Sequence, residues 1–218
     1  AEFDGHVVRG RGDYDVFVVS YDKDGRFRWV RTAGGKGYDY GHGVAVDSRG
    51  DVIVAGAVVG EATFGDVVVP NENGAHLFAA KYHADGELVW VKVATGKASG
   101  SAHGVVVDGQ DNIFIGGLSA GVGAFGAQAL SSPKGTSALV AKLDRDGQVL
   151  WLTQHPGEPS CLFHEIACDA QGRVWASGMF KGKAVVGPDT YATTNAKDSD
   201  ALICHYDTAG KLLWSRVG

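Results

Sequence analysis

The chain of 218 residues has a net charge of −5 and no cluster of lysine or arginine, so nucleic acid and anionic membrane surfaces are poor candidates as partners. Its 33 glycines are about twice the usual share, and aromatic and β-branched residues are plentiful, which excludes a disordered chain. No apolar run approaches the roughly 18 residues of a membrane-spanning helix, and three cysteines do not make a disulfide framework.

The first 30 residues contain the end of one repeat and a complete β-hairpin. Residues 1–12 resemble the stretch that begins at Ala62, so we interpret them as the end of a preceding repeat. The hairpin runs from Val16–Tyr21 through an Asp-Lys-Asp-Gly turn to Phe27–Val30. Apolar runs on both sides of a turn that ends in glycine predict two antiparallel strands.

That hairpin carries a motif, Tyr/Leu-Asp-x-x-Gly-x-x-x-Trp, which occurs four times, with His83 replacing the aspartate in the second copy. The tryptophans are 61, 61 and 63 residues apart, at Trp29, Trp90, Trp151 and Trp214. A constant period of this size predicts an array of one supersecondary unit. Tryptophans repeated at one strand position favour packing between repeats over a ligand-binding cage.

A different hairpin precedes each of the last three copies, at residues 43–56, 104–117 and 165–178. Its turn opens with Asp47, Asp108 or Asp169, and we expect each carboxylate to accept hydrogen bonds from turn amides. Consecutive hairpins without a helical period predict a four-stranded antiparallel meander in each repeat. The repeats span about 13–74, 75–136, 137–199 and a partial 200–218, as one domain or part of one.

Several segments carry a family resemblance: Asp39–Asp47 continuing through Val52–Gly56, the pair Phe64-Gly65, and Phe78–Tyr82 with Leu88–Trp90. Over essentially the whole chain, these repeats resemble the bacterial β-propeller repeats of secreted and cell-surface proteins. The hairpin that carries the tryptophan motif is also similar to the tryptophan-docking repeats of quinoprotein-like propellers. The resemblance implies an all-β propeller of four-stranded antiparallel blades, a scaffold or interaction role, and an extracellular, cell-surface or periplasmic location.

The two kinds of hairpin differ in number. Four hairpins carry the tryptophan motif, but only three hairpins of the other kind occur, at residues 43–56, 104–117 and 165–178. The chain therefore holds about three and a half blades, and such a ring does not close. We expect a fragment or an assembling subunit, in which a protein partner or a second copy of the chain completes the ring. A four-bladed ring with one incomplete blade is the alternative.

Candidate binding residues lie on the long connections within and between repeats, which a meander places on one face. His42, His103 and His164 are 61 residues apart, each just before the innermost strand of its repeat, which puts them at the rim of a central channel. They either cap their strands or bind a metal or an anion. Tyr38, Asp39 and Tyr40 form an aromatic and acidic loop that either packs or contacts a sugar or a protein.

The run Cys161-x-x-His164-x-x-x-Cys168 has the spacing of a metal motif, but Cys168 and Cys204 replace small apolar residues of other repeats. We therefore expect both cysteines in the core, because free cysteine behaves as a small apolar residue. Cys161 falls in the predicted loop His155–Phe163, which connects two hairpins, so we expect it to be the most reactive thiol.

Known catalytic motifs are missing from the sequence: there is no Gly-x-Ser-x-Gly, no His-Glu-x-x-His and no phosphate-binding glycine loop. We expect a non-catalytic scaffold that binds a protein or another ligand on its loop face, without a cofactor or a metal. A carbohydrate-binding lectin is one alternative. A lyase or hydrolase at the channel is another, with His164-Glu165 as its suggestive pair.

Overall fold

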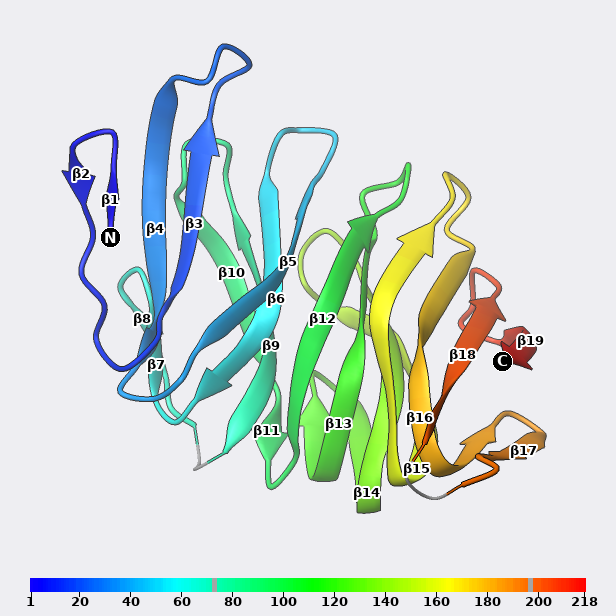
Figure 1. The fold of residues 1–218 in the computed structure, drawn as a ribbon. Helices are drawn as coiled ribbons and strands as arrows, with labels where there is room; N and C mark the ends of the chain where they lie inside the picture. Colours follow the sequence, from blue (N-terminus) through cyan, green and yellow to red (C-terminus); the bar gives the residue numbers. More distant parts are fainter. Residues whose placement is uncertain (72–73, 196–197) are drawn as a thin grey trace.

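A computed structural model describes residues 1–71, 74–195 and 198–218, which form β-strands joined by turns (Figure 1). The strands build several antiparallel sheets, none of which closes on itself within these ranges. The same residues include no helix long and apolar enough to cross a membrane. The predicted all-β class is confirmed.

The first sheet combines the predicted N-terminal hairpin with a small hairpin from later in the same predicted repeat. Its order is β3-β4-β7-β8, with β3 at Val16–Tyr21, β4 at Phe27–Gly35, β7 at Ala62–Phe64 and β8 at Val67–Val69. A separate pair precedes it, formed by β1 (Glu2–Phe3) and β2 (His6–Val7). We call β3 and β4 the half-unit.

The second sheet is one complete meander. Its order is β5-β6-β9-β10, with β5 at Tyr40–Val46, β6 at Val52–Val59, β9 at Ala75–Tyr82 and β10 at Leu88–Val93. Strands that follow each other in this series therefore lie side by side, as the consecutive hairpins predict. We call these four strands unit 1.

The third sheet contains the same order twice and is continuous through one long strand. Its members are β11 (Thr95–Gly96), β12 (Ser99–Val107), β13 (Ile113–Phe125), β14 (Gln128–Leu143), β15 (Val149–Cys168), β16 (Val174–Val186), β17 (Asp189–Ala192), β18 (Ser199–Tyr206) and β19 (Leu212–Val217). The first part of β15 pairs with β14 and its second part with β16. Unit 2 is therefore β12-β13-β14 with the first part of β15. Unit 3 is the second part of β15 with β16-β18-β19.

One predicted loop is wrong: residues 155–163 lie inside β15 instead of forming a loop between two hairpins. Gly157 and Glu158 pair with Ala184 and Lys183 of β16, which belong to the next unit. Three long connections carry extra strand pairings, formed by β7 with β8, by the ends of β13 and β14, and by β16 with β17. Each extends the last strand of the preceding unit, a pairing that the pattern within one repeat does not reveal.

Three buried clusters fill the spaces between successive units. In β9, Phe78 and Tyr82 face the half-unit, while Leu77 and Ala79 face unit 2. Burial on both faces explains why the strands read as nearly continuous apolar runs. Trp29 belongs to the first cluster and is 6% exposed, and Trp90 and Trp151 pack against the next two. The predicted packing role of these tryptophans is confirmed.

The turn aspartates have the structural role that the sequence predicts. Asp47 accepts hydrogen bonds from the amides of Arg49 and Asp51 at 2.9 and 3.0 Å, and Asp108 and Asp169 bond the equivalent amides of their turns. Asp47 also forms a buried ion pair with Lys81, at 2.6 Å.

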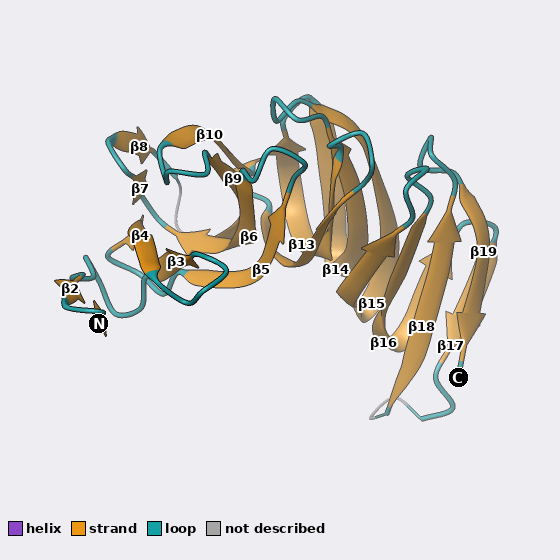
Figure 2. Ribbon diagram, turned by 90° about the horizontal axis from the view of Figure 1, so that it is seen from above, coloured by secondary structure: helices purple, strands orange, loops and turns teal. Residues whose placement is uncertain are grey.

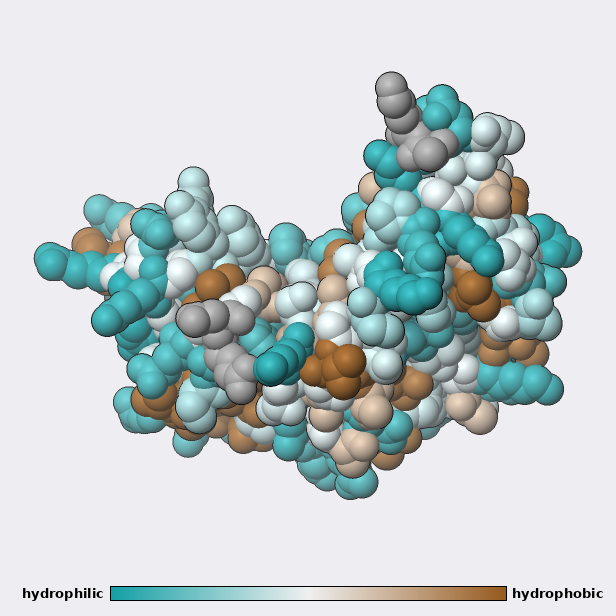
Figure 3. Space-filling view, turned by 90° about the horizontal axis from the view of Figure 1, so that it is seen from below, coloured by the Kyte–Doolittle hydropathy of each residue, from teal (hydrophilic) through white to brown (hydrophobic). Residues whose placement is uncertain are grey.

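The units follow one another in a curved row with the two chain termini at its opposite ends, as Figure 2 shows from above. The side toward which the row curves is hollow in the space-filling view of Figure 3. This arrangement leaves the half-unit and unit 3 each with one face that no other unit covers.

Candidate functional site

The three repeated histidines lie at β-bulges of the first strand of each unit. In β5, Gly41 pairs with Gly56 and Gly43 with Ala55, so His42 between them is the extra residue. The register shifts in the same way around His103 in β12 and His164 in β15. A bulge turns a side chain out of the regular alternation, and here it does so at the same place in each unit.

The bulges bring the three imidazole rings into contact in series, with a T-shaped contact between His42 and His103 and a stacked one between His103 and His164. The ring centres of His42 and His103 are 5.2 Å apart, and those of His103 and His164 are 5.5 Å apart. Nδ1 of His103 also lies 3.1 Å from the carbonyl oxygen of Phe163. Within the described ranges, no group of three or more histidine, cysteine, aspartate or glutamate side chains is arranged to hold a metal ion.

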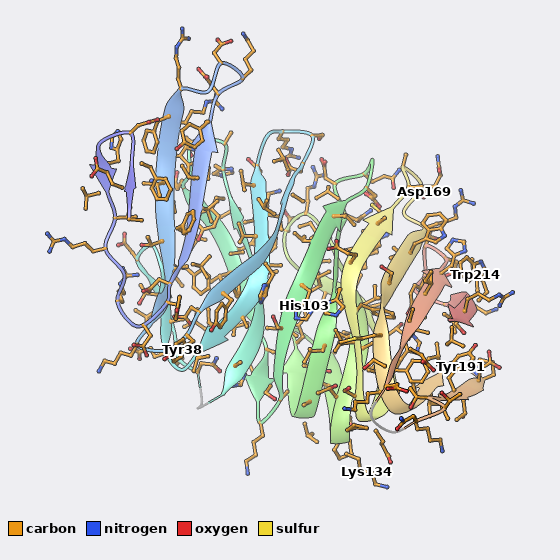
Figure 4. The ribbon with its side chains drawn as sticks, viewed as in Figure 1. Tyr38, His103, Lys134, Asp169, Tyr191 and Trp214 are labelled. Atoms are coloured by element: carbon orange, nitrogen blue, oxygen red, sulfur yellow. The ribbon has the colours of Figure 1, made fainter. Side chains whose placement is uncertain are left out.

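The tyrosines of the predicted loop continue this series of ring contacts. Tyr40 lies 5.9 Å from His42, and Tyr14 lies 6.1 Å from Tyr40 and 5.3 Å from Tyr38, between ring centres. Tyr14, Tyr38 and Tyr40 are 60%, 48% and 44% exposed. We call the six residues Tyr14, Tyr38, Tyr40, His42, His103 and His164 the aromatic row. Figure 4 labels Tyr38 near the β4–β5 connection and His103 on β12.

Tyr14 is the member that the sequence did not single out. It lies just before β3, and a backbone bridge to Tyr38 with a 2.9 Å hydrogen bond from the Asp39 amide brings it to the row. No repeated position marks it, since the equivalent residues of other repeats are not tyrosines. Only the pairing of two loops reveals its place.

Asp39 lies beside the row but is buried. Its carboxylate is 2% exposed and accepts hydrogen bonds from the amides of Gly35 and Val59, both at 2.7 Å. Burial raises the pKa of Asp39 above its usual value, the two amides oppose this, and the charge of Asp15 adds to it. Asp39 therefore fixes the loop that presents Tyr38 and Tyr40.

Two imidazoles of the aromatic row have a lowered pKa, which favours their neutral forms. Burial lowers the pKa of His42 below the usual histidine value. Burial is also the main reason for the lowered pKa of His103, and the neighbouring His42 contributes. These rings therefore offer neutral aromatic faces and single hydrogen-bonding nitrogens.

No protein-family model and no curated protein matches the chain. Among solved structures, it is similar to a protein of unknown function from Bacteroides caccae, with 11% sequence identity and a TM-score of 0.47. The similarity covers 95% of this chain and 70% of that one.

An apolar cavity adjoins the row between β3 and β5. Its volume is about 250 Å³, and its lining includes Phe17, Val18, Val19, Gly41, His42 and Val44. Among the described strands, β3 pairs only with β4, whereas the equivalent strands β9, β14 and β18 each have a neighbour on both sides. The cavity thus lies where a strand beside β3 would run.

The exposure of Val44 marks a second vacant position, one strand further from β3, which β5 fills beside β6 in unit 1. Val105 and Ile166 occupy the equivalent places in units 2 and 3 and are each 7% exposed, because Gly43 and Gly104 of the preceding units lie against them. Val44 is 64% exposed. No strand of the described structure covers it in the way that β5 covers Val105.

Cys161 does not have the reactivity that we expected of it. It lies inside β15 with no exposed surface, and burial raises the pKa of its thiol to about 11. The expectation fails because the predicted loop is a strand packed between units 2 and 3. Cys204 is buried in the same cluster and Cys168 packs against it, which confirms their predicted core positions.

Proposed function

We propose that the units are blades of a β-propeller and that the chain is a non-catalytic interaction module, which binds an extended segment of a partner protein beside β3. The blade assignment is supported by the strand order, which is the same in all three units, and by the curvature of the row. The resemblance of the repeats to secreted and cell-surface propellers favours a location outside the cytoplasm.

The observation that carries the binding proposal is the vacant position beside β3. A strand with one free edge presents unpaired amides and carbonyls, to which an extended segment can add as a further strand. The cavity next to that edge is lined by Phe17, Val19 and Val44, which suits apolar side chains. A second strand of the bound segment, folded back as in a β-hairpin, would lie against Val44, and a small residue fits best there, since Gly43 of β5 and Gly104 of β12 cover the two equivalents of Val44.

The aromatic row extends this surface along the first strands of the units. Its exposed tyrosines give flat apolar faces at low entropic cost, and its imidazoles give hydrogen-bonding groups. The imidazoles contact other rings and, in His103, a backbone carbonyl, which supports a role in binding over one in acid–base chemistry.

The test uses a synthetic peptide with the sequence of residues 43–56, because that hairpin fills the equivalent position beside β9 in unit 1. We expect saturable binding by calorimetry, slower exchange of β3 amides, and no binding of a scrambled peptide. Val44→Lys should abolish binding, and Val122→Lys, an exposed position on β13, should leave it unchanged. Equal binding by both variants, or none by the wild type, contradicts the proposal.

A carbohydrate-binding role is the second candidate, because the three exposed tyrosines of the row could stack against sugar rings. A glycan-array signal that Tyr40→Ser abolishes and Val44→Lys preserves would favour it. A glycan signal that Val44→Lys abolishes and Tyr40→Ser preserves would instead favour the peptide-binding proposal.

A further inference from the structure

One contact recurs at every junction between successive units. The indole Nε1 of Trp29 donates to the carbonyl oxygen of Ala84 at 2.8 Å. Trp90 donates likewise to Arg145 at 3.1 Å, and Trp151 to Thr208 at 3.3 Å. Each acceptor lies in the next copy of the tryptophan-motif hairpin, two residues before the glycine of its turn. A methyl group on Gly86, Gly147 or Gly210 would collide with the tryptophan ring, so the indole needs glycine there.

A second hydrogen bond accompanies this contact at two of the three junctions. It comes from the residue two positions after the tryptophan and goes to the carbonyl of the turn glycine. Arg31 Nε donates to Gly86 at 2.7 Å, and Thr153 Oγ1 donates to Gly210 at 3.1 Å. At these two junctions, one unit therefore donates hydrogen bonds to two backbone carbonyls of a single turn in the next unit.

Within the described residues, unit 3 carries the donor half of this junction without an acceptor. Trp214 is 38% exposed, against 6% for Trp29, and Figure 4 places it at the outer end of the row. The Arg216 guanidinium carbon lies 6.0 Å from the Trp214 ring centre, as that of Arg31 lies 5.8 Å from Trp29. Arg216 also donates to the carbonyl before it at 2.7 Å, as Arg31 does at 2.9 Å. The pair is thus already in the docking conformation.

The half-unit carries the acceptor half without a donor. Gly25 closes its turn with a 3.0 Å hydrogen bond from its amide to the Asp22 carbonyl, the same bond that Gly147 makes to Asp144. No heavy atom of the described structure lies within 4 Å of a methyl group built on Gly25. The carbonyls of Lys23 and Gly25 therefore stand where Ala84 and Gly86 receive Trp29 and Arg31.

The surfaces around the two free halves match in kind. Phe17 and Tyr21 of the half-unit are 54% and 42% exposed, whereas the equivalent Phe78 and Tyr82 are buried against a neighbouring unit. At the other end, Ile203 on β18 and Met179 on β16 are 43% and 37% exposed. Each end shows the apolar side that the interior junctions bury.

We propose that the chain associates head to tail with a second copy, in which Trp214 Nε1 donates to the carbonyl of the second copy's Lys23 and Arg216 to that of the second copy's Gly25. Within the described structure, three buried clusters hold the two end faces at opposite ends of the row of units, so the donor half of unit 3 and the acceptor half of the half-unit do not meet (Figure 2). The contact is heterologous, so it builds a ring or a filament according to the rotation at each step. It uses neither the aromatic row nor the hydrogen-bonding edge of β3, although Phe17 of the half-unit face also lines the cavity beside that edge.

The test is the concentration dependence of mass, by sedimentation and light scattering. We expect the wild-type mass to rise above the 22.8 kDa of one chain as concentration increases. Trp214→Ala and Gly25→Ala should each weaken association by roughly tenfold or more, through the lost indole contacts and a blocked turn. Leu213→Ala alters an exposed neighbour on β19, and Gly60→Ala imposes the same positive-φ strain at an open turn, so neither should change it.

Mixing the two variants gives the decisive outcome. The Trp214→Ala chain keeps its acceptor turn and the Gly25→Ala chain keeps its donor pair, so together they should form dimers that grow no further. A wild type that stays monomeric at every concentration overturns the proposal. So does association that both variants leave intact. Peptide binding beside β3 is measured separately and does not depend on either result.

Discussion

Individual residues in this chain take their properties from where the strands place them, as the histidines show. His42 and His164 are exposed at their bulges, whereas His155 in β15 is 2% exposed and its Nε2 lies 2.6 Å from the hydroxyl of Tyr206. Burial lowers the pKa of His155 from 6.5 to about 4. The 61-residue spacing revealed the first group, and nothing in the sequence distinguished His155.

The lowered pKa of His155 predicts acid sensitivity. Between about pH 6.5 and about pH 4 the unfolded chain binds a proton there that the folded chain does not, so the free energy of unfolding falls as pH falls through this window. The expected loss is roughly 3 kcal/mol. Urea titrations across the window should show it in the wild type and in His6→Gln, an exposed control. A slope that His155→Gln leaves unchanged would assign the effect to other groups.

At the scale of elements, the hairpins could be predicted and the joins between them could not. Turn residues and apolar runs within a single repeat predict the β3–β4 hairpin. They also predict the other tryptophan-motif hairpins and the hairpins that precede them. The pairing of β15 with both β14 and β16 depends on contacts between repeats, so Gly157 and Cys161 look like loop residues in the sequence. The bulges were also hidden, although the repeated glycines opposite them carry their signal.

Those glycines are required by the bulges. A methyl group on Gly117 would meet the carbonyl oxygen of Ser101 and the Cα of Ala102, which are backbone atoms that cannot rotate away. We expect Gly117→Ala to cost about 1–3 kcal/mol of unfolding free energy, and to shift the ring resonances of His103. Val122→Ala, an exposed change on the same strand, should cost much less. Equal urea midpoints for the two variants would show that the bulge tolerates a side chain.

At the scale of the whole molecule, the curved row is open in two ways. It has a vacant strand position beside β3, and it has one unpaired junction half at each end. The unequal number of inner and outer hairpins could be counted in the sequence, and the pairings confirm that count. The aromatic row could not be assembled from the sequence, because Tyr14 joins it only through the contact of two loops.

The central claim is that β3 has a free edge where β9, β14 and β18 have a neighbour. Residue-resolved amide hydrogen exchange tests it most directly, in the Trp214→Ala variant so that association between copies does not interfere. Every second amide of Val16–Tyr21, those directed away from β4, should exchange quickly, while the amides of β9, β14 and β18 are protected throughout. Uniform protection along β3 would contradict the account, because it would mean that the edge is already paired.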